Sequence, residues 1–283
     1  MKTFTIQIAL VVAVLGVSLA SSPLQAQQRG YSLNTFNASE RGSEWFAADS
    51  LDLRGELRPT IGLVGEWAYR TLVSRNADGD YARAIVRNQL VLHAGMSLVI
   101  KERLRLGLDL PVQAYADGKA ATIGATTYAP PDPKSSLGDI RLAADVRLLG
   151  RYGEPVTLAA GLQVALPSGN RDAYSGDGST RVTPQVMVAG DISQFVYAAR
   201  VGFTVRTAEP KLGTLSAGSY ASLALAAGAR VLDKRLVIGP ELLMQSVVTH
   251  SQFFKRNATP MEGLLGLHYT FDSGLRVGGG FGL

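Results

Sequence analysis

In LGDIRLAADVRLL, residues 137–149, charged and apolar side chains alternate along the chain. A period of two predicts a β-strand with one apolar and one polar face, because successive side chains of a strand point to opposite faces. This alternation suits a strand of a soluble sandwich as well as a strand of a membrane barrel. The charges of this stretch are Asp139, Arg141, Asp145 and Arg147.

Residues 1–26 have the organisation of a secretory signal peptide. Lys2 gives a positive start, residues 8–19 are apolar, and a small-residue cleavage site ends at Ala26. The apolar run is shorter than the roughly 20 residues of a transmembrane helix. We therefore expect Sec-dependent export with cleavage near Ala26.

The composition limits the possible classes of protein. The chain contains no cysteine, which excludes disulfides and zinc-thiolate sites. Hydrophobic residues make up 46% of the chain and charged residues 18%, against about 25% charged in a typical soluble domain. The net charge of +5 is spread along the sequence, without the basic and aromatic interleaving that would indicate a nucleic-acid partner.

The alternation returns in about eleven segments, and short connections between them alternate with long ones. This arrangement is typical of an outer-membrane barrel with tight periplasmic turns and longer outer loops. The sequence predicts an all-β protein, an antiparallel transmembrane β-barrel of about 12 strands over residues 50–283. Because such barrels usually have an even number of strands, we expect the last strand to be missing and the barrel to be truncated at its C-terminus. The short connections are 101–103, 150–154, 191–193, 232–234 and 272–274, and the long ones 75–81, 117–136, 167–180, 207–217 and 250–257.

In such a barrel the apolar face meets lipid and the polar face lines the lumen. Opposite charges on neighbouring strands could pair and fill the interior, or like charges could gather and select solutes. Acids and bases are interspersed on single strands, which favours pairing. In the first strand Glu66 and Arg70 share the inner face. The lumen-lining candidates are Arg87, His93, Arg105, Asp109, Asp139, Arg141, Asp145, Arg147, Arg200, Arg206, Glu241, Glu262 and His268.

Residues 27–49, before the first strand, are polar and lack alternation. This segment could be a periplasmic tail or could fold into the lumen as a plug. Its adjacent bulky residues, Trp45 and Phe46, are expected to anchor it to the barrel. Other aromatic residues on the lipid face or near strand ends are expected to form interfacial girdles: Trp67, Tyr69, Phe195, Tyr269 and Phe271.

No pattern of residues indicates an enzyme, a cofactor or a metal centre. The three histidines, His93, His250 and His268, are interpreted as polar lining or loop residues. The stretch from Asn76 to Asp80 resembles half of a calcium loop but lacks the distal glutamate. Its Asp-Gly pair is also a common turn signal, so a tight turn is favoured and calcium binding stays open.

The chain also resembles known families. SSLGDIRL (135–142), LQVALPSG (162–169) and GDG (176–178) resemble the outer-membrane barrels of the MetA pathway of phenol degradation family, whose members are suspected transporters of aromatic compounds. Residues 40–55, 239–242 and 268–271 resemble the N-terminal barrel of myxobacterial OmpA-family proteins. The resemblance implies a membrane barrel, often followed by an OmpA-type domain that binds peptidoglycan.

The leading functional hypothesis is passive passage of small solutes, aromatic or hydrophobic compounds among them, through a charge-lined lumen in the bacterial outer membrane. The alternative is a structural outer-membrane anchor with a filled lumen, linked to the cell wall by an OmpA-type domain beyond residue 283. Expected partners are outer-membrane lipids and lipopolysaccharide, small solutes, and peptidoglycan through a region not present in this chain. A secreted soluble β-sandwich is a third possibility, which requires the apolar faces to pack against one another.

Overall fold

A computed structural model of the chain describes residues 30–283, apart from 77, 124–125, 133, 210, 213–214 and 217. The expected signal peptide, residues 1–26, lies outside the described residues. Among the described residues, no helix has the length and apolar character needed to cross a membrane.

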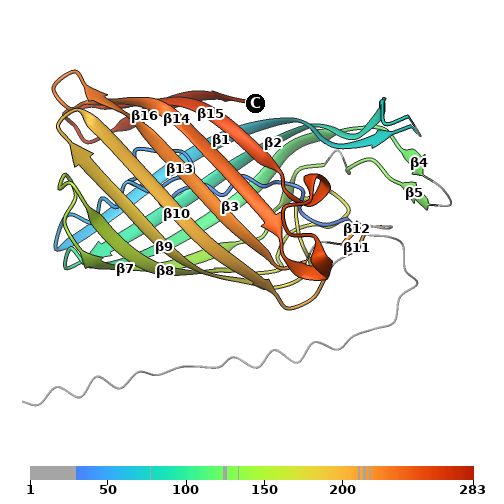
Figure 1. Cartoon of the computed structure of the whole chain (residues 1–283), viewed down its shortest axis with the longest axis horizontal. Coiled ribbons are helices and arrows are strands. Elements are labelled where there is room, and N and C mark those ends of the chain that lie inside the picture. The colour runs from blue at the N-terminus through green and yellow to red at the C-terminus, as the bar shows by residue number, and fades with distance from the viewer. Residues whose placement is uncertain are drawn as a thin grey trace, which may run out of the picture.

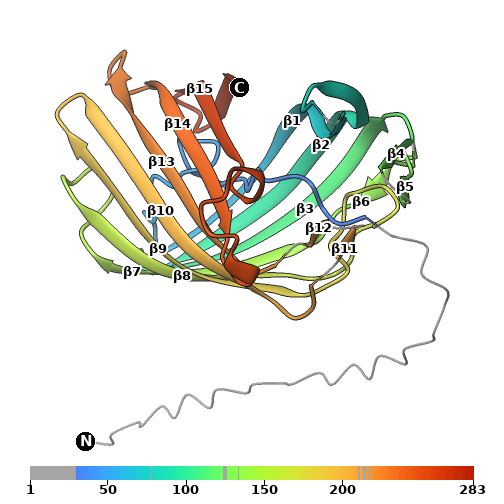
Figure 2. The same ribbon diagram turned by 45° about the vertical axis from the view of Figure 1, so that its right-hand side comes forward.

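The chain folds into one antiparallel sheet of 12 strands that curls through 331° and is nearly barrel-shaped (Figures 1 and 2). The predicted all-β, antiparallel architecture is thus confirmed. β6 (Ser136–Leu137) pairs with β3, and the other eleven strands follow one another around the sheet. In order they are β1 (Leu57–Arg75), β2 (Tyr81–Ile100), β3 (Leu104–Asp117), β7 (Arg141–Leu149), β8 (Thr157–Ala165), β9 (Arg181–Ile192), β10 (Phe195–Arg206), β13 (Tyr220–Val231), β14 (Leu236–Val247), β15 (Met261–Thr270) and β16 (Arg276–Gly282).

The connections alternate in length as the sequence predicted, except that the five residues between β1 and β2 are fewer than the seven between β7 and β8. Tight turns join β2 to β3, β7 to β8, β9 to β10, β13 to β14 and β15 to β16, and all of them gather at one end of the sheet, at the left in Figure 1. We call this the turn end and the opposite one the loop end. The long connections at the loop end carry two small hairpins and two short 3-10 helices. These are β4 (Ala121–Ile123) with β5 (Thr126–Tyr128), β11 (Lys211–Leu212) with β12 (Leu215–Ser216), η1 (Thr249–Ser251) and η2 (Arg256–Ala258).

The two faces of the sheet have opposite chemistry. On β7, Asp145 points inward and is 0% exposed, whereas its near neighbour Leu142 points outward and is 46% exposed. The register of β3 and β7 places Arg105 directly opposite Asp145, and Asp109 directly opposite Arg141. A slip of one residue would move these charges to the outer face, so the alternation fixes the register.

The expectation for Arg70 was wrong. The pairing of β1 with β2 shifts register between Tyr69 and Leu72, and Arg70 has a positive φ of 58°. A β-bulge of this kind re-aims the side chains that follow it. The Arg70 guanidinium is therefore exposed and lies over the rings of Tyr69 and Tyr81, 5.0 and 4.5 Å from their centroids.

Two apolar clusters lie inside the curl. The turn-end cluster joins residues that precede β1 to small and medium side chains of the wall, and the loop-end cluster joins β2 to the long connections. The turn-end cluster comprises Trp45, Ala48, Leu51, Leu53, Val99, Ala159, Met187, Ala189, Val196, Ala198, Ala224, Ala226 and Val237. The loop-end cluster comprises Ile85, Val86, Ala121, Tyr128 and Tyr174, with Tyr31, Leu33 and Leu72 packed against it.

Truncating Leu51, which is 0% exposed, should destabilise the fold. Leu51→Ala is expected to lower the free energy of unfolding by about 2–5 kcal/mol, because it removes buried methyl groups and leaves a cavity. Denaturant titration would follow the fluorescence of Trp45 in a Trp67→Phe background, since the chain has only two tryptophans. The control, Ile61→Ala, changes a side chain that is 80% exposed. Equal losses for the two variants would contradict the assignment of Leu51 to the core.

Candidate functional site

The interior of the sheet is occupied by residues 30–54, which we call the inner segment. It runs along the hollow from the loop end to the turn end (Figure 1). At the loop end the Ser32 amide donates to Asp177 Oδ1 at 3.1 Å. At the turn end, just after the segment, the Glu56 carbonyl accepts a hydrogen bond from the Lys101 amide at 2.7 Å.

The inner segment is locally folded by its serines. The Ser39 amide donates to the Phe46 carbonyl at 2.8 Å, and the Ser39 hydroxyl donates to the Trp45 carbonyl at 2.6 Å. The Ser43 hydroxyl accepts hydrogen bonds from the amides of Trp45 and Ser50, both at 3.2 Å. These contacts satisfy backbone groups that have left water without joining the sheet, as a buried chain requires.

Arg105 joins the inner segment to two strands of the wall. Its Nη1 and Nη2 donate to the Asp49 carboxylate at 3.1 and 2.8 Å, and its Nε and Nη2 donate to Asp145 Oδ2 at 3.1 and 2.8 Å. The side chains of all three residues are at most 2% exposed. One buried cation on β3 thus holds a carboxylate of β7 and a carboxylate of the inner segment.

Glu40 and Arg41 match a pair of wall charges. Arg41 Nη2 lies 2.7 Å from Asp109 Oδ1, and Glu40 Oε1 lies 3.2 Å from Arg141 Nη2. Asp109 and Arg141 are themselves opposite each other on β3 and β7, so two adjacent charges of the segment meet two paired charges of the wall. At Gly107 a Cβ atom would overlap the Glu40 carboxylate, so the close approach requires glycine there.

A third set of contacts lies near the turn end. Arg230 donates to both carboxylate oxygens of Glu44 at 2.8 Å, and the Tyr152 hydroxyl donates to Glu44 Oε1 at 2.7 Å. Burial and the Glu44 charge raise the pKa of Tyr152. Arg276, from β16, donates to the Gly42 carbonyl at 2.7 Å. The inner segment is therefore bonded to the last strand of the sheet as well as to its first half.

Glu241 of β14 binds the backbone of the inner segment. Its carboxylate accepts hydrogen bonds from three successive amides, those of residues 46, 47 and 48, at 2.7, 2.9 and 3.0 Å. The Phe46 ring lies beside the ring of His268, with 4.2 Å between centroids. Gly266 leaves room for Phe46, because a Cβ atom there would lie 2.9 Å from the ring.

At the loop end, the connection between β8 and β9 reaches into the hollow. Gln113 Nε2 donates to the Ala173 carbonyl at 3.0 Å. The carboxylate of Asp177 lies 3.0 Å from Arg206 Nη1 and 3.1 Å from Arg181 Nε. This connection therefore covers the wall of β2 and β3 and meets the start of the inner segment.

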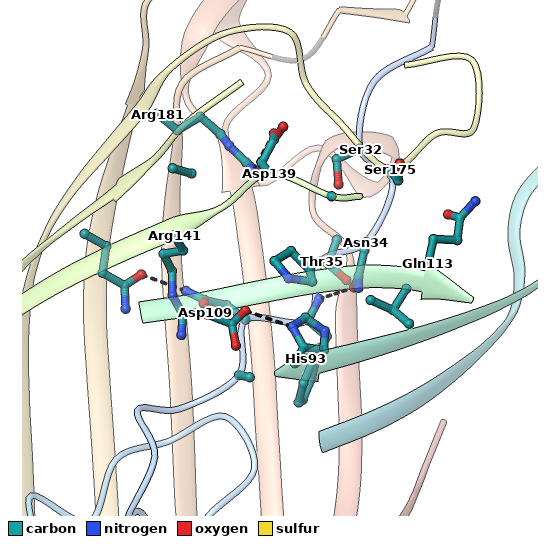
Figure 3. Close-up of a pocket in the computed structure, with 18 of the residues that line it drawn as sticks. Ser32, Asn34, Thr35, His93, Asp109, Gln113, Asp139, Arg141, Ser175 and Arg181 are labelled. Carbon is teal, nitrogen blue, oxygen red and sulfur yellow. Dashed lines mark hydrogen bonds and ion pairs between the residues drawn. The ribbon is translucent and has the colours of Figure 1, made fainter. Parts of the chain in front are cut away.

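A cavity of about 110 Å³ remains between the inner segment and the wall (Figure 3). His93 Nδ1 lies 3.0 Å from Asp109 Oδ2 on one side of it, and Asn34 Nδ2 donates to Glu66 Oε2 at 2.8 Å on another. At about 30 Å³ for each water molecule, this space holds a few waters.

Most of the sequence-predicted lining residues lie in this enclosed interior. Besides the contacts given above, Arg200 Nη2 donates to the Asn37 carbonyl at 2.9 Å, and Glu262 Oε1 accepts from the Thr35 hydroxyl at 2.5 Å. Asp139 Oδ2 lies 3.0 Å from Arg181 Nη2. The enclosed candidates are His93, Arg105, Asp109, Asp139, Arg141, Asp145, Arg200, Arg206, Glu241, Glu262 and His268.

Two candidates lie elsewhere. Arg87 points inward by parity, but its side chain is 52% exposed and pairs with Asp117 at 2.7 Å. The cause is the length of β2, which continues at the loop end beyond the shorter strands such as β7 (Figure 1). Arg147 is half-buried near the turn end of β7, and the side chain of His250 lies outside the described residues.

The stretch from Asn76 to Asp80 is a hydrogen-bonded turn in its described part, which excludes residue 77. Asn76 Oδ1 accepts from the Asp80 amide at 2.7 Å, and the Asn76 carbonyl accepts from the Gly79 amide at 3.0 Å. Within the described residues, no group of three His, Asp or Glu side chains is placed to hold a metal ion.

Sequence reasoning missed the partners of the wall charges. It expected pairing between neighbouring strands, and Arg105 with Asp145 is such a pair, but Asp49, Glu40, Arg41 and Glu44 supply further partners from the inner segment. One signal could have revealed these partners: the inner segment carries closely spaced charges, yet its sequence lacks the alternation of a strand.

Removing the Arg105 guanidinium should destabilise the protein strongly. Arg105→Met leaves the carboxylates of Asp49 and Asp145 buried without their cation, which is expected to cost about 3–5 kcal/mol of unfolding free energy. Arg87→Met, a matched change at an exposed position, should have little measurable effect. Denaturant titration of both variants tests this, and a small effect of Arg105→Met would show that the buried pairs are dispensable.

Asp52 should make stability depend on pH in acid. Burial acts to raise the pKa of its carboxyl, but hydrogen bonds from Arg54 and the charge of Arg58 outweigh this and hold the pKa below the ordinary 3.8. A depressed folded pKa stabilises above the unfolded pKa, and this contribution is lost as the pH falls through the folded pKa. Asp52→Asn should therefore be less stable than the wild type at neutral pH, and the difference should shrink below about pH 4. Titrations at several pH values test this; a constant difference would contradict it.

No protein-family model matches the chain, and no curated protein matches it. The resemblance to the barrels of the phenol-degradation and OmpA-type families therefore stands on the quoted segments. Of what it implies, the all-antiparallel, strongly curled sheet is present.

Proposed function

We propose that this protein is a bacterial outer-membrane β-barrel whose interior is closed by its own inner segment, so that it serves as a structural membrane anchor. The observation that carries the proposal is the bonding of wall charges to that segment, above all Arg105 to Asp49 at 2.8 Å. Outer-membrane lipids and lipopolysaccharide would contact its outer face. Attachment to peptidoglycan through an OmpA-type domain beyond residue 283 belongs to the same proposal.

The outer face of the sheet supports the membrane location. In a water-soluble protein, large apolar side chains are buried and charges face water. Here the wall charges lie inside, and large apolar side chains cover the outside of strand after strand, an area far larger than the scattered apolar residues of a soluble surface. Examples are Ile61, Leu63, Leu106, Leu142, Val146, Leu162, Val186, Val201, Leu265 and Val277.

Aromatic side chains gather toward both ends of the outer face. Trp67 stacks on Tyr115 in the half nearer the loop end, with 6.2 Å between ring centroids. Near the turn end Tyr269 and Phe271 make an edge-to-face contact at 4.8 Å. Two aromatic bands are what a barrel presents to the two interfaces of a bilayer.

The closed interior favours an anchor over an open pore. In an open pore the wall charges face water, whereas here the inner segment lies against them and leaves a cavity of about 110 Å³. Many buried salt bridges lie inside the sheet, beside the two apolar clusters. Solutes would meet no open route in this state.

Passive passage of small solutes, including aromatic or hydrophobic compounds, is the second candidate. It is favoured by the fact that the inner segment is one continuous stretch, whose covalent link to the wall is through Gly55 and Glu56 before β1. Displacement of that segment would expose a lumen lined by both signs of charge.

Planar-bilayer conductance of refolded protein tests the two candidates. The wild type is expected to shift on a gel when unheated and to be silent in the bilayer, whereas a variant lacking residues 30–50 should conduct. The control removes residues 78–80 from the exposed connection between β1 and β2, and should stay silent.

Other results of these measurements would contradict either the closed anchor or the membrane location. Steady conductance of the wild type would overturn the closed anchor and favour passage of solutes. A wild type that shows no gel shift and stays soluble without detergent would overturn the membrane location.

A further inference from the structure

The first residues of the inner segment lie among the long connections of the loop end. Arg171 Nε donates to the Gly30 carbonyl at 2.8 Å, and the Ser32 amide donates to Asp177 Oδ1 at 3.1 Å. Tyr31 packs against the loop-end cluster that includes Tyr174. Every one of these partners belongs to the loop end of the sheet.

The opposite end of the inner segment is fixed equally firmly at the turn end. The Gly55 carbonyl accepts from the Glu102 amide at 3.1 Å, within the tight turn between β2 and β3. Arg54 lies over the ring of Tyr152, from the turn between β7 and β8, 4.1 Å from its centroid. The chain therefore enters the hollow at the loop end and leaves it at the turn end.

Intermediate contacts exclude the reverse course. Asn37 and Glu40 bond to the middle of the wall through Arg200 and Arg141, and Glu44 follows with Arg230 toward the turn end. Arg230 is the second-last residue of β13, at the turn end, so the contact of Glu44 agrees with the direction that the two ends of the segment set.

In outer-membrane barrels short turns face the periplasm and long loops face the exterior. We infer that the mature N-terminus of this protein is displayed on the outer surface of the cell, after the chain has been threaded through its own barrel. This inference rests on the proposed membrane barrel and adds the side on which the N-terminus lies. Of the two alternatives that the sequence left open for residues 27–49, it takes the lumen plug over the periplasmic tail.

At the loop end, the start of the inner segment and the long connections form one surface. Tyr31 and Ser32 touch Tyr174 and Asp177 of the connection between β8 and β9, and that connection touches residue 129 through the Tyr174 hydroxyl at 2.7 Å. Residues 31 and 32 therefore lie within the surface that the long connections form at the loop end.

Cysteine labelling tests the inference cleanly, because the chain contains no cysteine of its own. Arg29→Cys places a thiol one residue before Gly30 in the sequence. Asp78→Cys marks the loop end and Asp233→Cys marks the turn end, and both aspartates are exposed. Intact cells that express each variant would be treated with a membrane-impermeant maleimide, before and after permeabilisation, and the gel shift of each variant would be recorded.

We expect positions 29 and 78 to be labelled in intact cells, and position 233 only after permeabilisation. Labelling of position 78 alone in intact cells, with position 29 reached after permeabilisation, would overturn the inference while leaving the membrane barrel intact. Labelling of position 233 rather than 78 in intact cells would mean that the turn end faces the exterior, and this would also overturn the inference. If unheated and heated protein migrated alike for all variants, the membrane barrel itself would instead be overturned.

A second variant guards against a thiol at position 29 that is sterically protected. A protease recognition sequence inserted between Arg29 and Gly30 should be cut by protease added to intact cells. The same sequence inserted after Asp233 should be cut only in permeabilised cells. Resistance of the N-terminal insertion in intact cells, with cleavage after permeabilisation, would overturn the inference.

Discussion

The buried guanidinium of Arg105, held between Asp49 and Asp145, is the interaction on which the rest of this structure depends. A charge removed from water is tolerated only when it is paired and its hydrogen-bonding groups are satisfied. A sheet whose charged face points inward must therefore supply partners for every one of those charges. Here the partners come from the neighbouring strand and from a segment of chain placed in the hollow, and both are needed at Arg105.

This requirement explains the composition of the inner wall. Where the inner segment passes close, glycine replaces larger inward residues, as at Gly107 beside Glu40 and at Gly266 beside Phe46. Where the segment carries apolar side chains, such as Trp45 and Leu51, the wall presents alanine, valine and methionine. The shape and charge of the wall are thus matched to one particular segment. In a water-filled lumen, by contrast, the wall residues contact only water.

The fold was predictable from sequence because its signal is local, whereas the site was not. Alternation within residues 137–149 defines a strand and its two faces without knowledge of any other residue, and connection lengths then give the topology. Glu241, by contrast, binds amides that lie 193–195 positions away in the sequence, and no periodic pattern links the two. Local exceptions also escaped: the bulge turns the Arg70 side chain outward, and the unequal length of β2 leaves Arg87 outside the enclosed interior.

The course of the inner segment also constrains the order of assembly. The eleven consecutive strands alternate in direction, so β1 and β16, the two edges of the sheet, run the same way. Arg276 of β16 donates to the Gly42 carbonyl, whereas Arg41 meets Asp109 of β3, so a short piece of the segment touches both sides of the curl. Such contacts form only when the wall has bent around the segment. Because the segment precedes β1 in the chain, it is available before any strand pair exists, and the buried charges of β3 and β7 gain their partners as the sheet curls. The same ion pairs that fill the hollow therefore also stabilise the curvature of its wall.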